Sequence, residues 1–198
     1  MKTVRILVYI ASLIIGLVWA SSIKYVPQSP FDKVVNVLNE GLAPVRLKGR
    51  WGYKDLQQRI VIEPQFEDAM GFSDGLAAVR QGGKWGYIDK AGQLVIQPQF
   101  TEASFFVNGR APQRFGERWG YIDKAGKIVV APRFTAAKRF SEGLAAVELD
   151  GKWGFIDTKG DLIIAPQFTL ALDFSEGQAH VRTEDKGLFI DKWGRVVK

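Results

Sequence analysis

The sequence contains no cysteine and only one histidine in 198 residues. Without cysteine the chain can form no disulfide bond, no thiolate metal site and no cysteine nucleophile, and it carries no lipidated N-terminal cysteine. A lone histidine, His180, cannot supply a histidine cluster for a metal ion. These two absences exclude sites built on thiolates or on several imidazoles.

A strong excess of positive charge is also missing. The chain has 27 basic and 21 acidic residues, a formal net charge of +6. If an N-terminal leader carrying Lys2 and Arg5 were removed, 25 basic residues would face the same 21 acids. Such a mild excess does not favour a nucleic-acid partner, because affinity for the phosphate backbone depends on many basic contacts.

Long hydrophobic runs are absent after the first residues of the chain. Lys2 and Arg5 precede an uncharged run from Ile6 to Ala20, and small residues follow at Ala20-Ser21. This order predicts a signal peptide over residues 1–20 and an exported, periplasmic or extracellular protein. An uncleaved membrane anchor reaching to about residue 23 is the alternative, since the uncharged run extends to Ile23. In both cases the membrane is a partner only through this segment.

Glycine and aromatic residues are plentiful, with 21 glycines and 12% aromatics. Glycine weakens helices, whereas aromatic side chains pack well on pleated sheets, so the composition favours an all-β fold.

A motif of tryptophan followed by glycine recurs every 34 residues. The four pairs are Trp51-Gly52, Trp85-Gly86, Trp119-Gly120 and Trp153-Gly154. A fifth copy around Gly187 has lost its tryptophan, and a worn copy of the segment after each proline begins at Pro30. Counted from Pro30, the chain after a linker at 21–29 holds five units, approximately 30–63, 64–97, 98–131, 132–165 and 166–198.

The segment SEGLAAVELDGKWGFIDTKGDLIIAPQF, residues 141–168, closely resembles the WG-repeat (KWG-repeat) family. That family is found mostly in bacterial proteins. The resemblance implies a β-rich interaction module without an established common ligand.

Turn residues predict how one unit folds. Asp150-Gly151 lies between two runs of strand formers and indicates a two-residue hairpin, in which Leu144–Leu149 pairs with Lys152–Asp157. A turn from Asp157 to Gly160 then leads into a third strand, which we expect Pro166 to end because proline has no N–H to donate. The segment after each proline could be a short strand, a bulged strand or a helical turn.

A unit of this size cannot bury its own hydrophobic face, so we expect neighbouring units to stack. The degenerate first and last copies favour an open, solenoid-like or superhelical stack of five antiparallel β-meander repeats. A closed five-unit ring resembling a propeller is the alternative. In either arrangement Trp-Gly has a structural role: tryptophan supplies apolar area, and glycine allows a close approach of neighbouring groups.

Cationic residues also recur. With a two-residue hairpin loop, Arg46, Arg80 and Arg114 would each lie opposite a tryptophan, which predicts arginine–tryptophan stacking. The copy RAPQRFGERWGY departs most from its neighbours and gathers basic and aromatic residues. The candidate partner surface therefore comprises Arg46, Arg80, Arg110, Arg114, Phe115 and Arg118.

No catalytic constellation emerges from these patterns. His180 falls in a column occupied by Ala78 and Ala146, and each aspartate of the 34-residue period opens a turn that contains glycine. We therefore expect a non-enzymatic binding or scaffolding module of the cell envelope, without metal or cofactor, for a protein partner. Binding of a carbohydrate or cell-wall polymer through aromatic and basic residues is the alternative.

Overall fold

A computed structural model describes residues 40–197. Every regular element in this range is a β-strand, and the range contains no helix long and apolar enough to cross a bilayer. The predicted signal peptide at 1–20, the linker at 21–29 and the first ten residues of the unit at 30–63 lie outside the described residues.

The strands form five antiparallel sheets, numbered here in chain order. Sheet 1 comprises β1 (Leu42–Leu47), β2 (Arg50–Asp55) and β3 (Ile60–Phe66). Sheet 2 comprises β4 (Asp68–Ala69), β5 (Ala77–Gln81), β6 (Lys84–Ile88) and β7 (Leu94–Phe100). Sheet 3 comprises β8 (Arg110–Phe115), β9 (Arg118–Asp123) and β10 (Ile128–Phe134). Sheet 4 comprises β11 (Ala136–Ser141), β12 (Leu144–Leu149), β13 (Lys152–Asp157) and β14 (Leu162–Phe168). Sheet 5 comprises β15 (Leu170–Ala171), β16 (Gln178–Arg182) and β17 (Gly187–Asp191).

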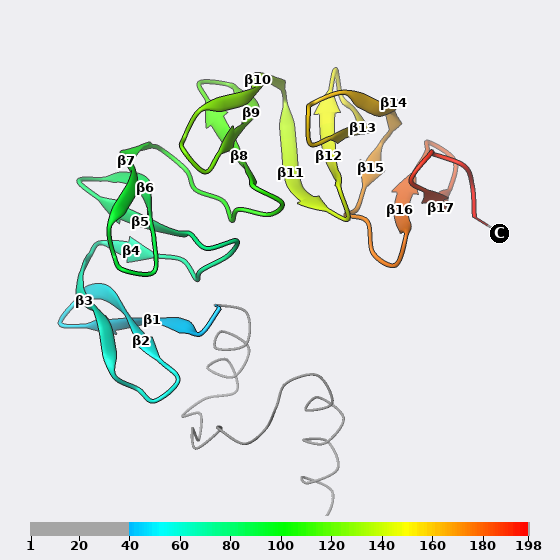
Figure 1. Cartoon of the computed structure of the whole chain (residues 1–198). Coiled ribbons are helices and arrows are strands. Elements are labelled where there is room, and N and C mark those ends of the chain that lie inside the picture. The colour runs from blue at the N-terminus through cyan, green and yellow to red at the C-terminus, as the bar shows by residue number, and fades with distance from the viewer. Residues whose placement is uncertain (1–39, 198) are drawn as a thin grey trace, which may run out of the picture.

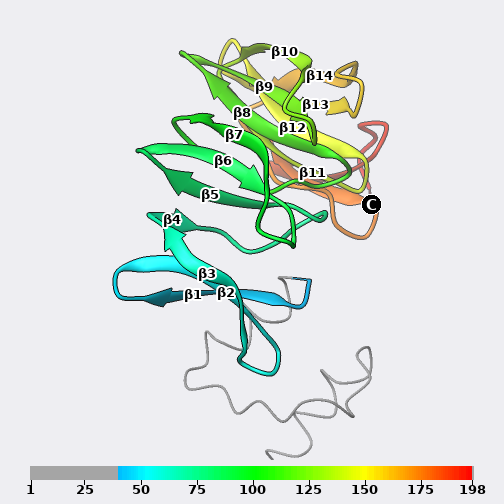
Figure 2. The ribbon, with the colours of Figure 1, turned by 60° about the vertical axis from the view of Figure 1, so that its left-hand side comes forward.

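The five sheets follow one another along an open arc (Figure 1). Sheet 1 and sheet 5 stand at its two ends and do not meet, and they remain apart in the second view (Figure 2). The all-β fold and the open stack of repeats are thus confirmed, and residues 40–197 do not close into a ring.

The predicted hairpin is present residue for residue. Leu149 pairs with Lys152 and Leu144 with Asp157, so the loop consists of Asp150 and Gly151 alone. Both loop residues have positive φ, 51° and 76°, as a type I′ turn requires. Both residues of the loops 48–49 and 82–83 also have positive φ, because each of these loops contains at least one glycine at the corresponding position.

The proline, in contrast, does not end its strand. Strand β14 continues through Pro166 to Phe168, which pairs with Trp153, whereas Ile164 pairs with Phe155. Between these two pairs β14 advances four residues while β13 advances two, so β14 bulges around Pro166. The bulge accommodates a residue that has no N–H to donate to the sheet. The expectation that Pro166 stops pairing was wrong, and each of the first four sheets ends two residues after its proline rather than at it.

The segment after the proline crosses to the next sheet as its first strand. Strands β4, β11 and β15 pair with the meanders that follow them in the chain. Of the three conformations left open by the sequence, sheets 2 and 5 adopt the short strand, of two residues each. Sheet 4 adopts the bulged strand, because β11 runs over six residues with a register shift between Ala137 and Phe140. Residues 101–109 of the described chain form no named strand before β8. In these three sheets the strand after the proline and the strand that it pairs with therefore belong to the same 34-residue unit.

Each pair of neighbouring sheets encloses its own hydrophobic core. An aromatic ring of one sheet meets a phenylalanine of the next, with ring centroids 4.8–5.0 Å apart. These ring pairs are Tyr53–Phe72, Tyr87–Phe106, Tyr121–Phe140 and Phe155–Phe174. The apolar area lies between units rather than within them, as expected for stacked repeats.

Candidate functional site

The predicted arginine–tryptophan pairs occur at one register in the first three sheets. Arg46 lies opposite Trp51, Arg80 opposite Trp85 and Arg114 opposite Trp119. All three arginines are exposed, and the hairpins that carry them turn on the outer side of the arc (Figure 1). The register therefore produces a recurring basic and aromatic column, which we call the outer rim.

The arginines of the outer rim differ in their contacts. The guanidinium carbon of Arg46 lies 6.0 Å from the centroid of the Trp51 ring, at the limit of a cation–π contact. Arg80 instead faces the carboxylate of Glu67 at 4.0 Å, and Arg114 forms an ion pair with Glu102 at 3.1 Å. Stacking is thus found at the first pair, while acidic side chains draw the other two guanidinium groups away.

The glycine of each Trp-Gly pair lies against the backbone of the neighbouring strand. A Cβ atom on Gly86 would come within 2.5 Å of the carbonyl oxygen of Ile96 and 2.8 Å of the Pro98 nitrogen. Gly52, Gly120 and Gly154 face the same contact in their own sheets. The predicted structural role is confirmed, and the group that approaches is the bulge containing the proline.

The tryptophans of the four Trp-Gly pairs are only half-buried. Trp51, Trp85, Trp119 and Trp153 pack against the inter-sheet cores but retain an accessible part. They therefore contribute to packing and to the surface at the same time.

The basic and aromatic residues of the divergent copy do not form one cluster. Arg114, Phe115 and Arg118 surround the hairpin between β8 and β9, where Phe115 packs edge-on against Phe100 at 6.2 Å. Arg110 stands at the opposite end of β8, paired with Asp123. At about 3.3 Å per residue along a strand, roughly 13 Å of β8 separates Arg110 from Arg114.

The divergent copy also holds a buried polar residue that sequence reasoning missed. Gln113 is 1% exposed, and its side-chain amide donates to the hydroxyl of Tyr87 at 2.7 Å. Burial is the main cause that raises the pKa of Tyr87, to about 12, so the hydroxyl stays protonated. The repeat column was the available signal, because Val79, Val147 and Val181 occupy the corresponding position.

The second missed feature is a ladder of ion pairs on the opposite side of the arc from the outer rim. A carboxylate in an Xaa-Gly loop accepts from the glycine amide 35 residues later and pairs with a lysine 50 residues later. Each such set, here called a rung, bridges successive sheets. The three rungs are Glu40–Gly75–Lys90, Asp74–Gly109–Lys124 and Glu142–Gly177–Lys192.

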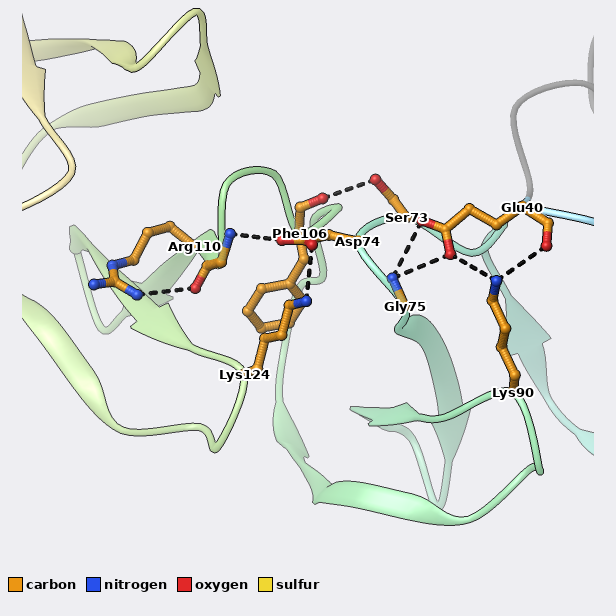
Figure 3. A network of polar contacts seen from close by, with 9 residues as sticks. Glu40, Ser73, Asp74, Gly75, Lys90, Phe106, Arg110 and Lys124 are labelled. Atoms are coloured by element: carbon orange, nitrogen blue, oxygen red, sulfur yellow. Dashed lines mark hydrogen bonds and ion pairs between the residues drawn. The ribbon is translucent and has the colours of Figure 1, made fainter.

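Figure 3 shows the first two rungs side by side. The loops that contribute their carboxylates and glycines lie along the inner side of the arc in Figure 1, which we call the inner rim. Burial raises the pKa of Asp74, but hydrogen bonds from Lys124 and Gly109 outweigh it and hold the pKa below its usual value. Glu142 also has a lowered pKa, mainly because Lys192 donates to its carboxylate.

The contacts of the aspartates of the 34-residue period and of His180 are contacts within turns and between side chains of one sheet. Oδ1 of Asp157 accepts from the amides of Lys159 and Asp161, at 2.9 and 3.0 Å, and so closes the turn. The His180 ring lies 5.2 Å from the ring of Phe189 on sheet 5. Among residues 40–197, no three side chains of the metal-binding types gather at one point.

Comparison with known proteins gives a match over most of the described chain. A family model described as "WG containing repeat" matches residues 51–85, 85–116, 119–153 and 153–186. No curated protein sequence matches significantly.

Solved structures with a similar fold have little sequence in common with this chain. The crystal structure of Kluyvelomyces marxianus Hsv2 is 11% identical, with a TM-score of 0.55 over 81% of this chain and 58% of that one. Kluyveromyces lactis Hsv2p is also 11% identical, with a TM-score of 0.52 over 81% and 60%. A structure titled as the eukaryotic initiation factor is 12% identical, with a TM-score of 0.53 over 81% and 52%. These neighbours resemble β-propellers, and the chain spans about three-fifths of the length of the Hsv2 structures; the likeness concerns the fold alone.

Proposed function

The chain belongs to the family of WG-containing repeat proteins, and from that premise we propose that it is a non-catalytic binding or scaffolding module for a protein partner. The outer rim would be the contact surface. The signal-like residues 1–20 support a location in the cell envelope, and the intact mass of the mature protein tests whether they are cleaved.

The recurrence of the same arginine–tryptophan pair at one register carries the proposal. Arginine and tryptophan are enriched among residues that dominate protein interfaces, because each offers a large contact area with a polar group at its end. Three equivalent pairs on successive sheets would let one partner make several similar contacts, and their contributions would multiply.

Substitution of the outer rim tests this proposal. The protein would be cross-linked in envelope fractions as the wild type and as the Arg46→Gln/Arg80→Gln/Arg114→Gln variant. Arg59→Gln/Lys127→Gln/Lys159→Gln is the matched control, because it removes the same charge from three exposed residues of the turns that lead into the third strands. We expect a specific adduct that the control retains and the outer-rim variant loses. Equal adducts in both variants would refute a role for the outer rim.

Carbohydrate binding is the second candidate, and the half-buried tryptophans favour it. An indole face that remains accessible can stack on a sugar ring. Glycans should then change the tryptophan fluorescence of the free protein, and the Trp85→Phe and Trp119→Phe variants should reduce that change. An unchanged spectrum with cell-wall glycans would remove this candidate.

A further inference from the structure

The ladder of the inner rim is interrupted between sheets 3 and 4. Glu40, Asp74 and Glu142 supply the carboxylate at the intact rungs, but the corresponding residue here is Asn108. The corresponding lysine is replaced by Thr158. Both charges of the rung have therefore been lost at one place in the array.

The main-chain donor of this rung is left without its acceptor. At the intact rungs the carboxylate accepts from Gly75, Gly109 or Gly177. Gly143 is the equivalent glycine, with a φ of 88° in the same kind of loop. Within the described part of the chain, no carboxylate accepts from the Gly143 amide. A backbone donor in the geometry that binds a carboxylate elsewhere is thus available here.

A cation nevertheless remains at the interrupted rung. Arg110 stands in a column that holds Leu42, Leu76 and Leu144 in other sheets. Its Nε lies 3.4 Å from the carbonyl oxygen of Thr158, the residue in the lysine column, and its Nη1 donates to the Gly109 carbonyl at 3.1 Å. Figure 3 shows the guanidinium group at the end of the chain of contacts. Among residues 40–197, Arg110 has no ion pair.

We propose that the interrupted rung is a binding site for a carboxylate of a partner polypeptide, held by the Arg110 guanidinium and the Gly143 amide. The intact rungs are the template, because each holds an Asp or Glu carboxylate between a cation and a glycine amide. A guanidinium binds a carboxylate in two parallel hydrogen bonds more readily than an ammonium group does. This inference rests on the proposed function, because it takes the bound carboxylate to be part of a protein partner.

The chemistry of the intact rungs favours an acidic peptide as the occupant. At the third intact rung the carboxylate belongs to the segment Ser141-Glu142-Gly143-Leu144, whose glycine has the positive φ of 88° that the loop requires. A partner with a Ser-Glu-Gly-Leu sequence would present the same group. This segment therefore defines the probe.

Selective labelling of glycine provides the test. The full chain, labelled with ¹⁵N-glycine, would be titrated with the peptide acetyl-Ser-Glu-Gly-Leu-amide. We expect the Gly143 amide signal to shift in a saturable manner, with a dissociation constant of ~1–10 mM, the order for a few contacts of this kind. The amides of Gly75, Gly109 and Gly177 already donate to internal carboxylates and should not shift.

Two variants and one control peptide complete the design. Arg110→Leu, which installs the residue found at positions 42, 76 and 144, should weaken binding about tenfold or more, the value of a lost charge-assisted contact. Asn108→Glu/Thr158→Lys rebuilds the internal rung and should abolish the shift by filling the site. Acetyl-Ser-Gln-Gly-Leu-amide should produce no saturable shift.

An absent Gly143 shift, an equal shift with the glutamine peptide, or equal shifts of all four glycines would overturn the proposal. Arg110→Leu binding the peptide as well as wild type would overturn it too. None of these results depends on the outer rim, so the cross-linking experiment above can succeed or fail independently.

Discussion

The glycine of each Trp-Gly pair has no Cβ atom, and this lets the neighbouring strand pass close to it. Gly86 lies under the proline bulge of β7, where an added Cβ would approach backbone atoms rather than a movable side chain. The bulge moves the proline out of the regular ladder, and glycine provides the space for it. The two residues therefore form one structural device, although 12 positions separate Gly86 from Pro98 in the sequence.

Gly86→Ala should consequently destabilise the array by about 2–3 kcal/mol, the cost of overpacking against a rigid neighbour. The midpoint of urea unfolding measures this loss. Gly82→Asn is the control: Gly82 has a φ of 59° and open space around its Cβ position, and asparagine tolerates this conformation. A smaller loss for Gly86→Ala than for the control would contradict the role assigned to Gly86.

The buried pair of Gln113 and Tyr87 allows a comparison with an apolar version in the same molecule. Between sheets 4 and 5 the equivalent residues are Val181 and Phe155. Tyr87→Phe alone should cost about 1–3 kcal/mol, because Gln113 and the Ser104 carbonyl both lose a partner. Replacing Gln113 as well should cost less than the sum of the two single substitutions, because the buried amide is then no longer left unpaired. A double-mutant cycle with Gln113→Val measures the coupling. Additive effects of the two substitutions would show that the hydrogen bond contributes nothing.

At the scale of elements, the inner-rim loops link stability to pH. The pKa of Asp74 is lowered in the folded chain, so its carboxylate stabilises the folded state. This stabilisation is complete at a pH above the ordinary aspartate pKa of about 4, and it is lost as the pH falls through the pKa of the folded state. The urea midpoint should therefore decrease on acidification from about pH 5 toward pH 3. In Asp74→Asn this decrease should be smaller, and at neutral pH the variant should lose at most about 1 kcal/mol, as expected for an accessible ion pair.

Asp161→Asn is the control for this pH profile, because Asp161 is exposed and has no ion pair among the described residues. Asn108 shows that an amide is tolerated at the equivalent position of another sheet. If Asp74→Asn and wild type had parallel pH profiles, the rung would not carry the assigned electrostatic contribution.

The elements also show which parts of the structure could be predicted from sequence. Hairpin registers such as Leu149 opposite Lys152 follow from two adjacent residues with positive φ, so local chemistry was sufficient. The role of Pro166 was mispredicted because the missing N–H was considered without the bulge that accommodates it. The strand after the proline pairs with the meander that follows it, and the proline itself gives no local signal for this pairing.

In the candidate surfaces too, contacts within one hairpin could be predicted from sequence, whereas contacts between sheets could not. Opposition of Arg46 to Trp51 was predicted because both residues belong to one hairpin. The rungs of the inner rim join residues 50 positions apart, and only the stacking of sheets brings them together. Arg110 was grouped with Arg114 and Arg118 by proximity in sequence, but the direction of β8 sends it to the inner rim instead.

At the scale of the whole molecule, the open arc gives the protein two separate rims. Each core is shared by two sheets, so the array is extended rather than closed around one centre. The outer rim presents the arginine–tryptophan pairs and the inner rim presents the ladder with its interrupted rung. The inner-rim proposal requires that the two ends of the arc remain apart, because closure would limit access to the inner rim.

The distance between the end sheets tests this architecture most directly. The chain has no native cysteine, so Leu47→Cys in sheet 1 and Leu172→Cys directly after β15 of sheet 5, both exposed, can carry spin labels without further changes. A control pair at Leu162→Cys and Leu172→Cys reports on two neighbouring sheets. We predict that double electron–electron resonance gives a clearly longer distance for the end pair than for the control. A distance between the ends as short as that of neighbouring sheets would contradict the open arc and show a closed ring.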